Sequence, residues 1–160
     1  MPDVALDAID RRILAEVQRE GRISNQDLSE RVGLSPSPCL RRLRLLEERG
    51  VISGYVALVD PERVGMAVTA FVRVRLDQQA DRQLATFEAA VAGFPEVMEC
   101  YIMTGDADYQ LRVVVPSLSA FEDFLRGKLT RIEGVSQVTT SLALRPIVYK
   151  TALPVGMVSP

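Results

Sequence analysis

The chain has 160 residues, 48% of them hydrophobic, and its 19 basic and 21 acidic side chains give a formal net charge of −2. This length accommodates one large domain or two small ones. Histidine is missing, and with it the commonest general base and metal ligand, and we find no phosphate loop, nucleophile elbow or HExxH motif. We therefore expect that the protein is not an enzyme and that it binds no metal and no cofactor.

The sequence also limits location and partners. It has no signal peptide and no apolar stretch long enough to span a bilayer, which favours a cytoplasmic protein without a membrane partner. Cys39 and Cys100 are too few for a disulfide framework, so we expect two free thiols, with Cys100 buried in a strand. Because the net charge is slightly negative, any contact with a nucleic acid must come from a local cluster of basic residues.

Apolar residues at helical spacing predict a first helix from Asp7, its cap, to about Glu20. Its apolar stripe consists of Leu6, Ile9, Ile13, Leu14 and Val17. Together with the two helices that follow, this helix predicts a compact three-helix unit.

The next two helices are joined by a short turn. Ser24 caps the first of them, and Gly33 ends it in the left-handed conformation. Ser35 caps the second, Pro36 falls at the first helical position, where a missing N–H costs nothing, and Gly50 ends the helix. This is the layout of a helix-turn-helix, whose second helix enters the major groove of DNA.

The second helix of this pair has two faces. Its apolar stripe consists of Leu40, Leu43 and Leu46, and its opposite side carries Ser37, Arg41, Arg42, Arg44 and Leu45. Arginines near a helix start oppose the helix dipole, but they suit phosphates and guanine edges. The alternative is an ordinary solvated face. The residues that we expect to contact double-stranded DNA are Ser35, Ser37, Pro38, Arg41, Arg42 and Arg44.

Residues 52–59 predict a strand that Asp60 and Pro61 end, as a short wing or the start of a connection. The composition then changes from helical to strand-rich. We therefore predict a winged helix-turn-helix domain at residues 1–60, a linker at 61–66, a second domain at 67–150 and a tail at 151–160.

The second domain reads as β-α-β twice. The predicted strands cover residues 67–76, 97–103, 109–115 and 136–144, and the predicted helices cover 81–91 and 119–129. Ser119 and Glu122 have the spacing of a capping box. The pattern predicts a ferredoxin-like βαββαβ domain, so the whole chain belongs to the α+β class.

One strand of this domain indicates self-association. Leu111, Val113 and Val115 point to one side of the strand and Val114 to the other, so both faces of the sheet are apolar. Because helices cover only one face of a ferredoxin-like sheet, the other face needs a partner. We expect a homodimer, which would also present two recognition helices to two half-sites on DNA.

A hairpin at residues 104–109 (TGDADY) carries two carboxylates, Asp106 and Asp108, next to Gly105. Glycine and aspartate are ordinary turn residues, so a plain hairpin is one interpretation. The other interpretation is a pocket for a small zwitterion, with a carboxylate on its ammonium group and backbone N–H groups on its carboxylate.

Residues 6–14 (LDAIDRRIL), 33–43 (GLSPSPCLRRL), 50–55 (GVISGY), the hairpin and the link Gly134–Val135 form a combined pattern. This pattern resembles the Lrp/AsnC family of prokaryotic transcription regulators, from residue 6 to about residue 150. The resemblance implies a winged-helix DNA-binding domain and a dimerising C-terminal domain, with dimers that often join into tetramers or octamers. It also implies that an amino acid binds where dimers meet, near the hairpin and the last strand. The effector-binding residues implied are Thr104, Gly105, Asp106, Asp108, Thr140 and Ser141.

We therefore predict a nucleoid-associated, DNA-binding transcription regulator whose assembly and DNA binding respond to a small effector, an amino acid. Two alternatives stay open. One is an architectural DNA-binding protein without an effector. The other is a small-molecule-binding module that regulates an enzyme by contact, which leaves the arginine-rich helix without a role.

Overall fold

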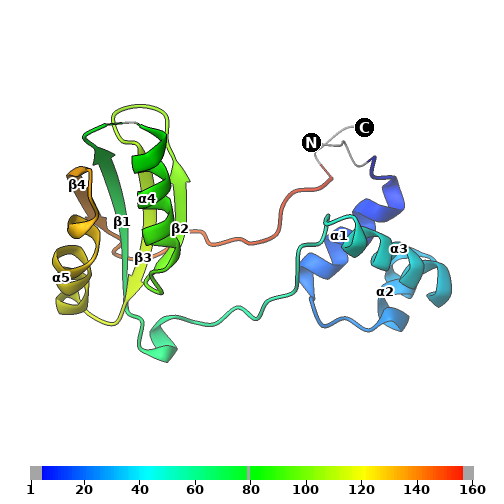
Figure 1. The fold of residues 1–160 in the computed structure, drawn as a ribbon. Coiled ribbons are helices and arrows are strands. Elements are labelled where there is room, and N and C mark those ends of the chain that lie inside the picture. Colours follow the sequence, from blue (N-terminus) through cyan, green and yellow to red (C-terminus); the bar gives the residue numbers. More distant parts are fainter. Residues whose placement is uncertain (1–4, 79, 157–160) are drawn as a thin grey trace. The chain divides into compact units, whose positions relative to one another are not determined.

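The computed structural model describes residues 5–78 and 80–156, and this part of the chain divides into two compact units. Unit 1 comprises residues 5–58 and 148–156, and unit 2 comprises residues 59–147. Figure 1 draws unit 1 as a cluster of helices and unit 2 as a sheet with helices on it. The chain therefore passes between the units twice, after residue 58 and after residue 147.

Unit 1 contains α1 (Ala8–Arg19), α2 (Asn25–Val32) and α3 (Pro36–Glu48), so the three predicted helices are confirmed. All three helices contribute to one apolar core. Helices this short are stable mainly because they bury apolar side chains against one another. The buried residues of this core are Ile13, Leu14, Val17, Leu28, Val32, Cys39 and Leu46.

The predicted helix ends depend on single residues. The Ser24 hydroxyl accepts the N–H of Asp27 at 3.1 Å, and Gly33 ends α2 with φ 74°. Ser35 occupies the cap position of α3 but makes no capping hydrogen bond. Pro38, at the third helical position, lacks one of the two N–H groups that a capping hydroxyl can accept, and the other, of Ser37, makes no such bond.

The strand predicted at residues 52–59 is wrong: these residues form no ladder with any described part of the chain. Ile52 is half-buried against the core of unit 1, but the apolar side chains after it are exposed, Val56 by 85% and Leu58 by 65%. β-branched residues favour a strand, but a strand forms only where another strand takes up its backbone hydrogen bonds.

The C-terminal segment, residues 148–156, packs on α1. Gln18 donates to the carbonyl of Leu153 at 3.2 Å and accepts the N–H of the same residue at 2.7 Å. The Arg11 guanidinium donates to the carbonyl of Val155 at 3.1 Å, and the Val155 side chain packs against the core of unit 1. Residues 148–150, which the sequence assigned to the second domain, therefore belong with unit 1.

Unit 2 has the element order β1 (Val68–Leu76), α4 (Asp81–Ala92), β2 (Val97–Ile102), β3 (Tyr109–Val115), α5 (Leu118–Gly127) and β4 (Val135–Leu142). Short 3-10 turns, Glu62–Val64 and Leu129–Arg131, precede β1 and β4. The strands lie in the order β2-β3-β1-β4, and every neighbouring pair is antiparallel. This is the ferredoxin-like βαββαβ arrangement, so the predicted fold class is confirmed.

Both helices of unit 2 cover the same face of the sheet (Figure 1). Alternate residues of β1 and β3 point into the core beneath them, among them Val72 and Leu111, both 0% exposed. The other face carries the intervening residues, such as Phe71, which is 38% exposed. Alternation with a period of two assigns each residue to its face.

Two predictions about unit 2 are wrong in detail. Helix α5 is capped by Ser117, whose hydroxyl accepts the N–H of Ala120, so Ser119 and Glu122 form no capping box. A hydroxyl two positions earlier starts the helix sooner. Cys100 is exposed: it pairs with Leu111 and so lies on the helix side of the sheet, but on the edge strand β2 it lines the open groove beside α4.

Candidate DNA-binding surface and effector pocket

Helix α3 presents one polar stripe to solvent. Ser37, Arg41 and Arg44 are all exposed, and at 100° per residue they lie on one side of the helix. Cys39 and Leu46 are buried on the opposite side, at 0% and 3% exposure, while Leu40 and Leu43 are only half-buried. The buried side thus lies around Cys39 and Leu46, which turns the arginine stripe fully outward.

The start of α3 adds groups suited to an anion. Ser35 and Ser37 are exposed. Pro36 and Pro38 have no N–H and the N–H of Cys39 donates to the carbonyl of Ser35, so the first turn offers an anion the N–H of Ser37 together with the two hydroxyls. Neither hydroxyl is needed to cap the helix, so both can donate outward. A phosphate at a helix N-terminus is stabilised by such donors and by the helix dipole.

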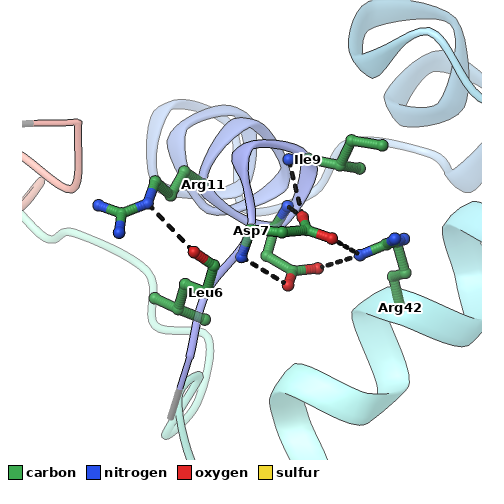
Figure 2. A network of polar contacts seen from close by, with 6 residues as sticks. Leu6, Asp7, Ile9, Arg11 and Arg42 are labelled. Atoms are coloured by element: carbon green, nitrogen blue, oxygen red, sulfur yellow. Dashed lines mark hydrogen bonds and ion pairs between the residues drawn. The ribbon is translucent and has the colours of Figure 1, made fainter. Parts of the chain in front are cut away.

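Arg42 is the one predicted DNA-contacting arginine that the structure places elsewhere. Its Nη1 lies 2.7 Å from Oδ2 of Asp7 and 2.8 Å from Oδ1 of Asp10 (Figure 2). These two bonds connect α3 to the beginning of α1. The sequence pattern assigned Arg42 to the outer face because its angular position lies at the border between that face and the α1 side.

Cys39 is a packing residue of α3. It is fully buried, and burial raises the pKa of its thiol. A reactive cysteine needs the opposite, an accessible thiol of lowered pKa. The surroundings of Cys39 therefore favour a packing role over redox sensing.

In unit 2, the hairpin between β2 and β3 is held against β1. Oδ2 of Asp108 accepts the N–H of Leu76 at 2.7 Å, and the N–H of Asp108 donates to the carbonyl of Val74 at 3.0 Å. Gly105 has φ 116°, a backbone conformation that side chains resist. Asp108 thus anchors the hairpin, and Asp106, which is 83% exposed, stands at its tip.

A small recess of about 70 Å³ lies beside this tip, on the face of the sheet that the helices leave bare. Its lining consists of Arg73, Arg75, Asp106, Ala107, Gln137 and Thr139. The guanidinium of Arg73 lies 3.5 Å from the carboxylate of Asp106, so opposite charges meet in it.

Only Asp106 of the predicted effector-binding residues lines this recess. Thr140 is paired with Val72 and so lies on the helix side of the sheet, whereas Ser141 is paired with Phe71, further along β4. The missed residues could have been found from the sequence. Once alternate positions of β1 are assigned to the core, Arg73 and Arg75 must point to the other face.

A larger groove of about 460 Å³ lies between α4 and β2. Its charged lining residues are two acids, Glu88 and Glu99, and no lysine or arginine lines it. The Glu88 carboxylate already accepts the Tyr109 hydroxyl at 2.8 Å. A ligand carboxylate would find no cation there, so this groove suits a free amino acid less well than the smaller recess does.

In the part of the chain that the structure describes, no helix is long and apolar enough to cross a membrane. Both units also match known families. Residues 6–53 match the winged helix-turn-helix DNA-binding domains, and residues 69–153 match the Lrp/AsnC ligand binding domain.

Characterised relatives span nearly the whole chain. A Bkd operon transcriptional regulator of Pseudomonas aeruginosa is 46% identical over 149 residues, which cover 93% of this chain and 97% of the relative. A leucine-responsive regulatory protein of Rhizobium meliloti is 46% identical over 144 residues, which cover 90% and 92% of the two chains.

Solved structures agree with this assignment. A transcriptional regulator of Neisseria meningitidis in complex with L-Met has a TM-score of 0.90 and 41% identity, and covers 94% of this chain and 97% of its own. An AsnC family regulator of Agrobacterium tumefaciens has a TM-score of 0.90 and 42% identity, and covers 94% and 98%. The chain belongs to the Lrp/AsnC family of transcription regulators, with a winged helix-turn-helix DNA-binding unit and a ligand-binding domain.

Proposed function

We propose that this regulator binds double-stranded DNA through the outer stripe of α3 and that an amino acid bound by unit 2 controls its assembly on DNA. Ser37, Arg41 and Arg44 contact the major groove, and Ser35 contacts a phosphate at the start of the helix. The observation that carries this proposal is the exposure of both arginines on one side of a recognition helix, opposite its buried side.

The recess at the hairpin tip is the proposed effector site. Arg73 suits the carboxylate of an amino acid and Asp106 its ammonium group. The recess is shallow, since the Asp106 and Arg73 side chains that would hold the ligand are 83% and 48% exposed, so it encloses only part of such a ligand. A chain of a neighbouring dimer, lying against the hairpin, would enclose the remainder.

This arrangement links ligand binding to assembly. The regulator acts as a homodimer, and dimers join further into tetramers or octamers when the enclosed ligand stabilises their contact. Each dimer presents two copies of α3, so the assembly state determines how many DNA sites are held at once. A relative of the same fold was solved with L-Met, which supports an amino acid as the effector class.

The DNA part is tested by binding curves of the full chain on captured chromosomal fragments, at several salt concentrations. Arg41→Ala and Arg44→Ala should each weaken binding and flatten the dependence of affinity on salt, because each lost phosphate contact removes about one unit of slope. Arg126→Ala removes the same charge from exposed α5 and serves as the control. Equal affinities for all three variants would refute the assignment.

The effector part is tested by thermal shift with a panel of free L-amino acids. A ligand that binds only the folded protein raises the melting temperature, and Asp106→Ala should abolish that rise. An architectural DNA-binding protein would bind DNA normally and respond to no amino acid. That result would overturn the effector proposal and leave the DNA proposal intact.

A further inference from the structure

The beginning of α1 is built as a rigid acidic platform. Oδ1 of Asp7 accepts the N–H groups of Ile9 and Asp10, both at 2.8 Å, and Oδ2 of Asp10 accepts the N–H of Asp7 at 3.3 Å. This is a capping box in which each carboxylate uses one oxygen on the backbone. The other oxygen of each carboxylate is therefore held in a fixed direction.

Those two remaining oxygens converge on one atom, Nη1 of Arg42 (Figure 2). The side chains of Asp10 and Arg42 are 16% and 29% exposed and that of Asp7 is 51% exposed, so water competes less with the bond to Asp10 than with the bond to Asp7. The backbone N–H of Asp10, and after it the Arg42 guanidinium, lower the pKa of the Asp7 carboxyl. The Asp7 carboxylate is therefore charged at neutral pH, and its contact with Arg42 persists there.

The contact does something that the apolar core does not. Cys39 and Leu46 hold α3 against the core by burial, which does not depend strongly on direction. Charge-assisted hydrogen bonds do depend on direction. Because Arg42 directly follows Arg41 on the helix, fixing it on α1 fixes the rotation at which the outer stripe faces away.

We propose that Asp7 and Asp10 are positioning residues for DNA binding: through Arg42 they set the rotation of the recognition helix, so that two acids increase the affinity for a polyanion. This inference rests on the proposed DNA-binding function. It also means that Arg42 positions the helix and does not itself contact a phosphate of the DNA.

The test uses the double variant Asp7→Asn/Asp10→Asn in the full chain. Asparagine caps a helix as well as aspartate does, so the capping hydrogen bonds stay while the two acceptors facing Arg42 are replaced. Simple electrostatics predicts tighter DNA binding, because two negative charges leave the DNA-binding unit. We expect weaker binding, by about fivefold, as the fraction of helices in the competent rotation falls to about one fifth.

The salt dependence separates positioning from contact. The slope of affinity against salt should match that of the unmodified protein, because no phosphate contact is lost. Arg42→Lys should show the same defect and, added to the double variant, should weaken binding little further, since the three residues act as one unit. Asp27→Asn/Glu30→Gln removes two charges from α2 and is the matched control, with unchanged or tighter binding.

Tighter binding by the double variant, with a steeper salt slope, would overturn the proposal, because a released Arg42 would then be reaching a phosphate. Unchanged binding would overturn it as well. Hydrogen exchange of α1 and α3 in the same variant establishes that unit 1 stays folded. Arg41→Ala, measured in the same series, keeps the two proposals apart: if it has no effect, the DNA-binding stripe itself is refuted.

Discussion

Gly33 lies in the turn between α2 and α3, where the free-energy cost of a left-handed backbone conformation can be measured with little contribution from side-chain contacts. It has φ 74° and ψ 39°, and a Cβ added there would meet no heavy atom within 4 Å. An L residue pays about 1–2 kcal/mol for this left-handed conformation. Replacing glycine by alanine also removes about 0.4–1 kcal/mol of chain entropy from the unfolded state. Gly33→Ala should therefore destabilise unit 1 by about 1 kcal/mol.

The assay is amide hydrogen exchange on the full chain, because two units need not unfold together. Peptides from α2 and α3 should lose protection by about fivefold, which corresponds to that free energy. Peptides from α4 and α5 should not change. Gly33→Asn should lose less, because asparagine enters the left-handed region more readily.

Gly54 provides the matched control. A Cβ there also meets nothing within 4 Å, but its φ is outside the left-handed region. Gly54→Ala should therefore be neutral or slightly stabilising. Protection of α2 and α3 in Gly33→Ala equal to that of the unmodified chain, or an equal loss in Gly54→Ala, would refute the reasoning.

Three further predictions concern stability. Tyr109→Phe should destabilise unit 2 by about 1.5–3 kcal/mol, measured by urea unfolding, because the buried hydroxyl donates to the Glu88 carboxylate. The pKa of Asp7 is lowered in the folded protein, so its carboxylate adds to the free energy of unfolding above pH 3.8, and this stabilisation is lost as the pH falls below that value. The free energy of unfolding of Asp7→Asn should therefore depend less on pH in the acid range. Gln18→Ala loses both bonds to Leu153, so residues 148–156 should exchange their amide hydrogens faster while α5 stays protected.

Much of the fold was predictable because its signals are local. Ser24 and Gly33 mark the ends of α2 by their own hydrogen bond and backbone angle, and both were identified correctly. The alternation of apolar residues along β1 assigned each side chain to a face without knowledge of the neighbouring strands. Where a residue's environment comes from within a few positions, the pattern contains the answer.

The errors have two physical causes, one local and one long-range. The Ser35 hydroxyl was assigned a capping bond that it does not make, and a proline three positions later, which removes one of the two possible donors, is visible in the sequence itself. By contrast, nothing local indicates that Arg42 binds acids that lie 35 and 32 positions earlier. Nor does periodicity reveal that residues 52–59 find no partner strand among the residues that the structure describes.

The sequence by itself determined the helix-turn-helix, the βαββαβ order and the basic character of α3, because capping, periodicity and turn chemistry act over a few residues. Only the tertiary structure decided which arginines of α3 face outward, which side chains meet at the hairpin recess, and that residues 148–156 pack on α1. Each of these depends on two segments far apart in the chain. Their meeting is governed by packing of the whole core, which no short stretch of sequence encodes.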